Sequence, residues 1–133
     1  MPSVRVFLDH PSLRTGLSAF EKEASRLLAK EGAASRRTDI VLSGDSLLRK
    51  LNKKFRRKDK PTDVLSFAFN EPGFLGEIYI SLDRAKKQAR EYGLSFRDEI
   101  RRLMVHGLFH LLGYTHYRKK TRSAMEKKES VYL

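Results

Sequence analysis

The feature that most constrains the fold is the segment 96–112, in which apolar side chains cover most of the circumference of a helix. A helix of this composition is expected to be largely buried against the rest of the chain. Two histidines, His106 and His110, nevertheless stand four residues apart in it and so share one helical face. Because buried imidazoles need polar partners, the pair predicts a bound ligand such as a metal ion.

A third histidine follows just beyond this helix. Gly113 is placed to end the helix with a positive φ, and His116 lies past the turn, where it can approach the first two. Three imidazoles leave one position of a tetrahedral metal ion open for water, as a catalytic zinc site requires. Separate histidines with ordinary hydrogen bonds explain this spacing less well. The chain has no cysteine, so histidine must supply the ligands.

The pattern His-x-x-x-His-x-x-Gly-x-x-His differs from that of zinc peptidases at one position. Those enzymes place a glutamate, their general base, directly after the first histidine. Gly107 stands at that position here. The sequence therefore predicts a zincin-like helix with metal-bound water but without the peptidase base.

The charge of the chain points to a polyanionic partner. The 28 Lys and Arg exceed the 16 Asp and Glu, which gives a net charge of +12. Nucleic acid is the commonest partner of such a chain, although a generally basic solvated surface would give the same total. Basic residues concentrate at 49–60 and at 118–122. The second cluster starts two residues after the third histidine. The candidate nucleic-acid contacts are Arg57, Lys58, Lys60, Arg118, Lys119 and Lys120.

Periodicity predicts one α/β (α+β) domain over residues 1–133, with a mixed sheet of about four strands packed with helices. Strands are expected at 4–9, 39–43, 63–69 and 76–81. The 63–69 strand has apolar residues on both faces, which suggests a central, covered position. Helices are expected at about 12–30, 46–55 with Ser46 as cap, 82–92, 95–112 with Ser95 as cap, and from 121 onward.

No apolar run approaches the roughly 18 residues that span a bilayer. The N-terminus also lacks the layout of a signal peptide, so a cytoplasmic protein is expected.

Two motifs of this chain resemble the YbeY family of bacterial metal-dependent endoribonucleases and ribosomal RNA maturation factors. One is the segment 106–116, similar to the family's His-Gly-x-x-His-Leu-x-Gly-Tyr-Asp-His. The other is the segment 51–67, similar to Leu-Asn…Arg…Asp-x-Pro-Thr-Asp-Val-Leu-Ser-Phe; the strand 75–81 resembles a third family segment. Thr115 stands where the family usually has aspartate, and a hydroxyl cannot act as a carboxylate. Glu77 replaces another usual aspartate.

The resemblance implies specific roles for residues of this chain. The family's zinc ligands fall on His106, His110 and His116, and its functionally important arginine falls best on Arg56, with Arg57 adjacent. One Zn²⁺ per chain is expected, although imidazole also suits nickel and other divalent metals. The implied partners are single-stranded RNA, ribosomal RNA and the small ribosomal subunit with its proteins. No membrane partner is implied.

The implied function is a single-strand-specific, metal-dependent endoribonuclease. It would act in maturation of the 3′ end of small-subunit ribosomal RNA and in ribosome quality control. Two alternatives remain. One is a non-catalytic RNA-binding ribosome assembly factor with a structural metal, which His10 as a fourth ligand would favour. The other is a metal-dependent hydrolase of another substrate, against which Gly107 and the missing cysteine ligands speak.

Four aromatic residues have two interpretations. Phe55, Phe67, Phe69 and Tyr79 are suited to stacking on RNA bases. Their helix and strand spacing favours positions in the core instead.

Overall fold

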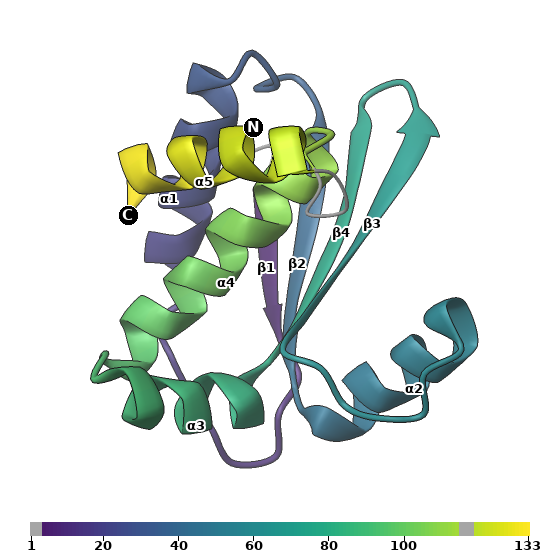
Figure 1. Ribbon diagram of the computed structural model, residues 1–133, viewed down its shortest axis with the longest axis vertical. Coiled ribbons are helices and arrows are strands. Elements are labelled where there is room, and N and C mark those ends of the chain that lie inside the picture. The colour runs from purple at the N-terminus through teal and green to yellow at the C-terminus, as the bar shows by residue number, and fades with distance from the viewer. Residues whose placement is uncertain (1–3, 115–118) are drawn as a thin grey trace.

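The computed structural model describes residues 4–114 and 119–133. Its elements are β1 (Val4–Leu8), α1 (Ser18–Lys30), β2 (Arg37–Ser43), α2 (Asp45–Arg56), β3 (Val64–Glu71), β4 (Phe74–Ser81), α3 (Leu82–Tyr92), α4 (Phe96–Leu111) and α5 (Lys119–Tyr132). The four strands form one mixed sheet in the order β1-β2-β4-β3 (Figure 1). β1, β2 and β4 are parallel, and β3 is antiparallel to β4. The predicted fold class is confirmed.

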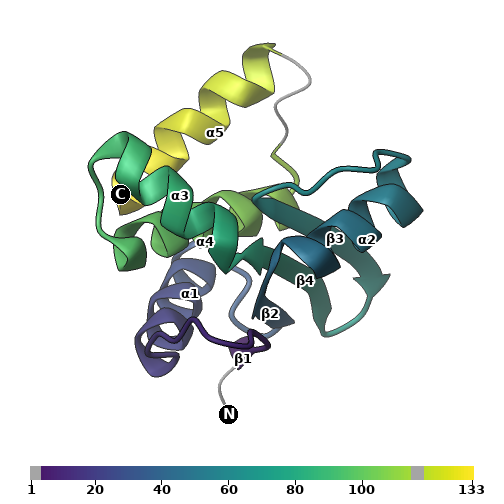
Figure 2. The same cartoon turned by 90° about the horizontal axis from the view of Figure 1, so that it is seen from below.

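The core lies between one face of the sheet and the helices α1 and α4. Alternate strand residues such as Val4, Ile40, Ile78 and Ile80 are fully buried on this face. α1 packs against β1, and α4 contacts both β3 and β4. Figure 2 shows α1, α3, α4 and α5 on one side of the molecule, with α2 apart from them. The apolar circumference of the 96–112 segment is explained by this central position of α4, whose residues Ile100, Leu103, Leu108 and Phe109 are buried.

The prediction that the 63–69 strand is central is wrong, because β3 is an edge strand. β4 lies between β2 and β3, so only one side of β3 forms strand hydrogen bonds. The apolar residues on both faces have another cause. α4 packs against one face, whereas Phe55 of α2 contacts Phe67 on the other, with ring centroids 5.1 Å apart.

The expected cap of α2 is also wrong, because Ser46 does not cap it. The helix begins at Asp45 after Gly44, which provides no side-chain cap. A carboxylate from α3 takes that role: Asp83 Oδ2 accepts the Asp45 N–H at 2.9 Å. α1 begins at Ser18, later than expected. The segment before it turns at His10, whose Nδ1 accepts the N–H groups of Ser12 and Leu13.

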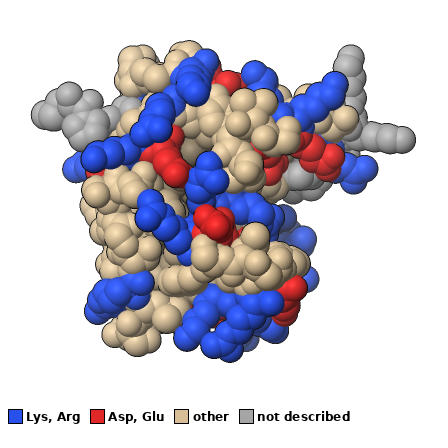
Figure 3. All heavy atoms as spheres, turned by 90° about the vertical axis from the view of Figure 1, so that its left-hand side faces the viewer, with Lys and Arg blue, Asp and Glu red and all other residues tan. Residues whose placement is uncertain are grey.

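Lys and Arg side chains are spread over the helical side of the molecule rather than gathered in one patch (Figure 3). Part of the net charge of +12 is therefore a generally basic surface. Among the described residues, no helix is both long and apolar enough to cross a membrane.

Candidate metal and RNA-binding site

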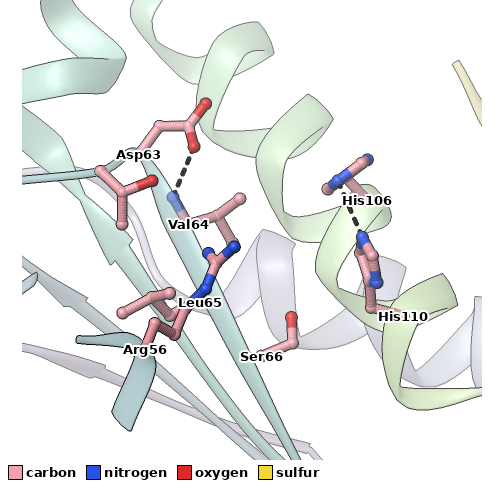
Figure 4. Close-up of a pocket in the computed structure, with 8 residues that line it drawn as sticks. Arg56, Asp63, Val64, Leu65, Ser66, His106 and His110 are labelled. Carbon is pink, nitrogen blue, oxygen red and sulfur yellow. Dashed lines mark hydrogen bonds between the residues drawn. The ribbon is translucent and has the colours of Figure 1, made fainter. Parts of the chain in front are cut away.

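A cleft of about 450 Å³ opens along the free edge of β3. Three parts of the chain form it: the end of α2, the start of β3 with the loop before it, and the C-terminal half of α4. Figure 4 shows Arg56 on one side of this cleft and the two histidines of α4 on the other. The residues that line it are Arg56, Thr62, Asp63, Val64, Leu65, Ser66, His106 and His110.

The two histidines of α4 bring the same ring nitrogen, Nε2, close together. The Nε2 atoms of His106 and His110 lie 3.1 Å apart, and the ring centroids are 4.7 Å apart. Two ligand nitrogens about 2.05 Å from a tetrahedral zinc ion would be separated by about 3.3 Å. The pair therefore matches two corners of a tetrahedral site. Neutral imidazole is also the commonest metal ligand in proteins, so the donor set fits a metal such as zinc.

The third expected ligand, His116, lies outside the described residues, as do Thr115 and Arg118. Within residues 4–114 and 119–133, no group of three His, Cys, Asp or Glu could hold a metal ion. The end of α4 nevertheless has the expected form. Gly113 has a φ of 101°, so the chain leaves the helix in a conformation that glycine favours.

Gly107 has a packing role that explains the missing peptidase base. It faces the sheet, where a Cβ atom would lie 2.9 Å from Ile78 Cγ2 and 3.0 Å from Ser66 Oγ. The Ser66 hydroxyl also donates to the Gly107 carbonyl at 3.3 Å. A glutamate at 107 would have to displace these neighbours. The packing of α4 on the sheet therefore leaves no room at position 107 for the general base of a zinc peptidase.

His106 has a second polar neighbour outside the cleft. Its Nδ1 lies 3.3 Å from Oε1 of Glu129, which projects from α5. The two side chains are 23% and 15% exposed, so this contact is largely shielded from water. The sequence analysis did not single out Glu129. Only its helical spacing from Met125 hinted that it faces the core.

Arg56 is the last residue of α2, and its exposed side chain reaches the cleft. The adjacent Arg57 ends the helix in a left-handed conformation with a φ of 55°. Arg57, Lys58 and Lys60 are exposed and do not line the cleft. Lys119 and Lys120 begin α5, but their side chains are outside the description.

Comparison with known proteins identifies the family. A model of the family described as Endoribonuclease YbeY matches residues 12–133. This chain belongs to the YbeY family. A relative of that name from Solibacter usitatus is 48% identical over 110 residues, which are 83% of this chain and 74% of the relative. One from Carboxydothermus hydrogenoformans is 41% identical over 122 residues, 90% of this chain and 85% of the relative.

A solved structure shares this fold. The solution structure of TM1509 from Thermotoga maritima matches with a TM-score of 0.70 at 28% sequence identity. The match covers 97% of this chain and 85% of the other, so the fold is shared along nearly the whole length.

Asn52 organises the basic loop of this YbeY-family chain, a role that the sequence analysis missed. It is 1% exposed, and its Nδ2 donates to the Lys60 carbonyl at 2.9 Å. The backbone carbonyl of Asn52 accepts the Lys58 N–H at 3.2 Å. Asn52 thus holds the first part of the loop that follows Arg56. A buried asparagine in a basic, exposed helix is the signal that could have revealed it.

Several other residues of the YbeY motifs have structural roles. Asp63 accepts hydrogen bonds from the Val64 N–H at 2.8 Å and from Gln88 at 3.2 Å. Tyr114 packs edge-on against Phe109, with centroids 5.6 Å apart. Glu77 lies opposite Phe67 on β4, outside the cleft lining. Burial, and then the negative charge of Glu77, raises the pKa of the Tyr79 phenol.

The preference for core positions is wrong for Phe55 and only partly correct for the other three aromatic residues. Phe55 is 57% exposed, and Phe67, Phe69 and Tyr79 are half-buried. These four aromatic side chains lie on or against β3 and β4. α2 covers this part of the sheet only incompletely.

His10 does not lie in the cleft. Its Nε2 bonds to Asp83 Oδ1 at 2.9 Å, and both residues line a different cavity. His10 therefore does not complete a closed site with His106 and His110, which removes the observation that would have favoured a structural metal.

Proposed function

We propose that this protein is an endoribonuclease that cleaves single-stranded RNA with the help of one bound metal ion and acts in ribosomal RNA maturation. The observation that carries the proposal is the convergence of two Nε2 atoms, 3.1 Å apart, in a cleft that Arg56 also lines. Its relatives bear the name Endoribonuclease YbeY. The 3′ end of small-subunit ribosomal RNA is the proposed substrate, with ribosome quality control as the wider role.

His106, His110 and His116 would hold the metal, for which zinc is the first choice. A metal in such a site lowers the pKa of a bound water toward ~7 and polarises a phosphoryl oxygen. His106 and His110 come from one helix, so their spacing is fixed locally, and His116 follows six residues later in the sequence. The open edge of β3 leaves space beside them for an extended RNA strand.

Arg56 would bind a nonbridging phosphate oxygen. Its guanidinium can donate two parallel hydrogen bonds and keeps its charge at any physiological pH, so it can stabilise charge that develops on the phosphate. Arg57, Lys58 and Lys60 follow it on an exposed loop, where they would contact flanking phosphates. Arg118, Lys119 and Lys120 are proposed to do the same from beyond His116.

The test compares cleavage of a single-stranded RNA that carries the 3′ region of small-subunit ribosomal RNA. Wild type, chelated protein and His110→Ala are assayed, and bound metal is quantified in each. His10→Gln serves as a control because His10 lies outside the cleft.

Cleavage and bound metal should both disappear in the chelated sample and in His110→Ala but persist in His10→Gln. Re-addition of zinc should restore the chelated wild type only. Cleavage by His110→Ala at the wild-type rate would contradict the proposal, as would tight RNA binding by wild type without metal-dependent cleavage.

A further inference from the structure

We infer that Glu129 of α5 is a positioning residue that holds the imidazole of His106 in the orientation required for metal binding. The inference rests on the proposed metal site and adds to it a carboxylate from a different helix. The Glu129 Oε1 atom lies 3.3 Å from His106 Nδ1. The Glu129 side chain is 15% exposed, so the contact is not that of a freely solvated surface carboxylate.

The chemistry of the two groups fixes which ring nitrogen is available to a metal. An ionised carboxylate only accepts hydrogen bonds, so Nδ1 of His106 must carry the proton, and this N–H donates a hydrogen bond to Glu129. In the neutral ring, Nε2 then carries the lone pair. Nε2 is the atom that faces His110 at 3.1 Å. Glu129 thus selects the tautomer whose unprotonated nitrogen is the one that faces His110.

Metal-binding histidines commonly donate their second ring N–H to a carboxylate or a carbonyl. This contact fixes the ring and makes the ligand nitrogen more basic. Glu129 and His106 have the same arrangement: Nδ1 contacts the carboxylate, and Nε2 faces His110. The family's usual aspartate at position 115 is a threonine in this chain. A carboxylate for one ligand therefore comes from α5 and does not depend on position 115.

The packing of α5 keeps Glu129 in place. Met125, Glu129 and Tyr132 share one helical face at spacings of four and three residues. Met125 is fully buried, and the Tyr132 hydroxyl donates at 3.1 Å to Glu31, the C-cap residue of α1. Lys128 forms an ion pair with the same carboxylate at 3.2 Å. Attachment of α5 to α1 therefore sets the position of a carboxylate beside α4.

This arrangement links metal affinity to the docking of α5. The test measures the dissociation constant for Zn²⁺ in wild type, Glu129→Gln and Glu129→Ala by competition with a chromophoric chelator. Glu126→Gln is the matched control, since Glu126 is an exposed glutamate of the same helix. Thermal unfolding of the metal-free proteins shows whether each variant folds. The visible spectrum of the Co²⁺-loaded proteins reports the geometry of the site.

Glu129→Ala should weaken zinc binding about 10- to 100-fold, the range found when such an orienting partner is removed. Glu129→Gln should have a smaller effect because the amide oxygen can still accept a hydrogen bond. Glu126→Gln should bind zinc like wild type. The Co²⁺ spectrum should change in the Glu129 variants only, and RNA cleavage should largely recover at saturating zinc.

Wild-type zinc affinity and an unchanged Co²⁺ spectrum in both Glu129 variants would overturn the inference while leaving the metal site intact. Should Glu129→Ala fail to fold, the near-isosteric Glu129→Gln decides by the same criteria. If wild type itself bound no metal, the proposed function would fail together with this inference. The two failures can be told apart, because the failure of the proposed function would already be seen as absent metal binding in wild type.

Discussion

A Cβ atom at Gly107 would lie 2.9 Å from the Cγ2 atom of Ile78, so α4 crosses the sheet at a distance that leaves no room for a side chain. This close approach places the helix that carries His106 and His110 directly beside β3 and β4. The position of the proposed metal ligands therefore depends on the absence of one methyl group.

Gly107→Ala should destabilise the protein and weaken metal binding. Overpacking a core costs about 1–3 kcal/mol, and the better helix propensity of alanine returns at most about 1 kcal/mol. We expect a net loss of about 1–2 kcal/mol in the free energy of unfolding, measured by chemical denaturation. Gly16→Ala is the control, because nothing lies within 4 Å of a Cβ atom at Gly16. Equal stability of Gly107→Ala and wild type would show that the helix can shift freely.

Arg56→Lys should lower kcat/KM for RNA cleavage by about tenfold or more, while bound metal stays constant. The charge is kept, but lysine cannot make the two parallel hydrogen bonds of a guanidinium. Arg57→Lys makes the same exchange one residue later, at a side chain that does not line the cleft. We expect less than a twofold change there. The reverse order of effects would assign the functional role to Arg57.

Asn52→Ala should loosen the loop that follows Arg56. It removes the hydrogen bond to the Lys60 carbonyl and leaves that carbonyl without this partner, which typically costs about 1–3 kcal/mol. The free energy of unfolding should fall by this amount, and cleavage should fall through loss of order at Arg56. Arg49→Ala is the comparison, because its ion pair with Asp59 is about half exposed and screened by water, so it should contribute little to stability. If both variants lost equal stability, the anchoring role of Asn52 would be refuted.

The stability of the protein should depend on pH through Asp83. Burial alone would raise the pKa of this carboxylate, but the Asp45 N–H and the His10 imidazole donate to it and lower the pKa below its ordinary range. A lowered pKa in the folded state gives stability that is present above the unfolded pKa of about 3.9 and lost as the pH falls through the folded value.

Chemical denaturation of wild type at pH 7 and at pH 3 should show this loss, and Asp83→Asn should reduce it. Asp9→Asn removes an exposed charge next to His10 but leaves both hydrogen bonds of Asp83, so most of the pH dependence should remain. An unchanged pH dependence in Asp83→Asn would exclude this carboxylate as the titrating group.

Local features of the fold were predictable because their causes lie within a few residues. The Ser95 side chain accepts the Asp98 N–H at 3.0 Å, as the cap of α4 should. Gly113 adopts the positive φ expected where this helix ends. In contrast, the cap of α2 comes from Asp83, 38 residues from Asp45, and no local pattern reveals a cap from a distant helix.

The residues of the site also include some that local sequence predicts and some that depend on long-range packing. The spacing of His106 and His110 on an apolar helix was enough to predict that their rings would meet, because a helix fixes which residues share a face. Arg56 was predicted through its motif, and its place across the cleft depends on how α2 packs against the sheet. Glu129 and Asn52 were missed, since each acts on a partner that only long-range packing or loop folding brings into contact.

By itself, the sequence determined the helix that carries the histidines, the mixed α/β class and the family. Each follows from local periodicity, turn residues or motif spacing. Only the tertiary structure decided that β4 lies between β2 and β3, which leaves β3 at the edge and opens the cleft along it. The physical reason is that strand order depends on which backbone edges pair over long distances, and the side-chain pattern of a single strand does not record its partner.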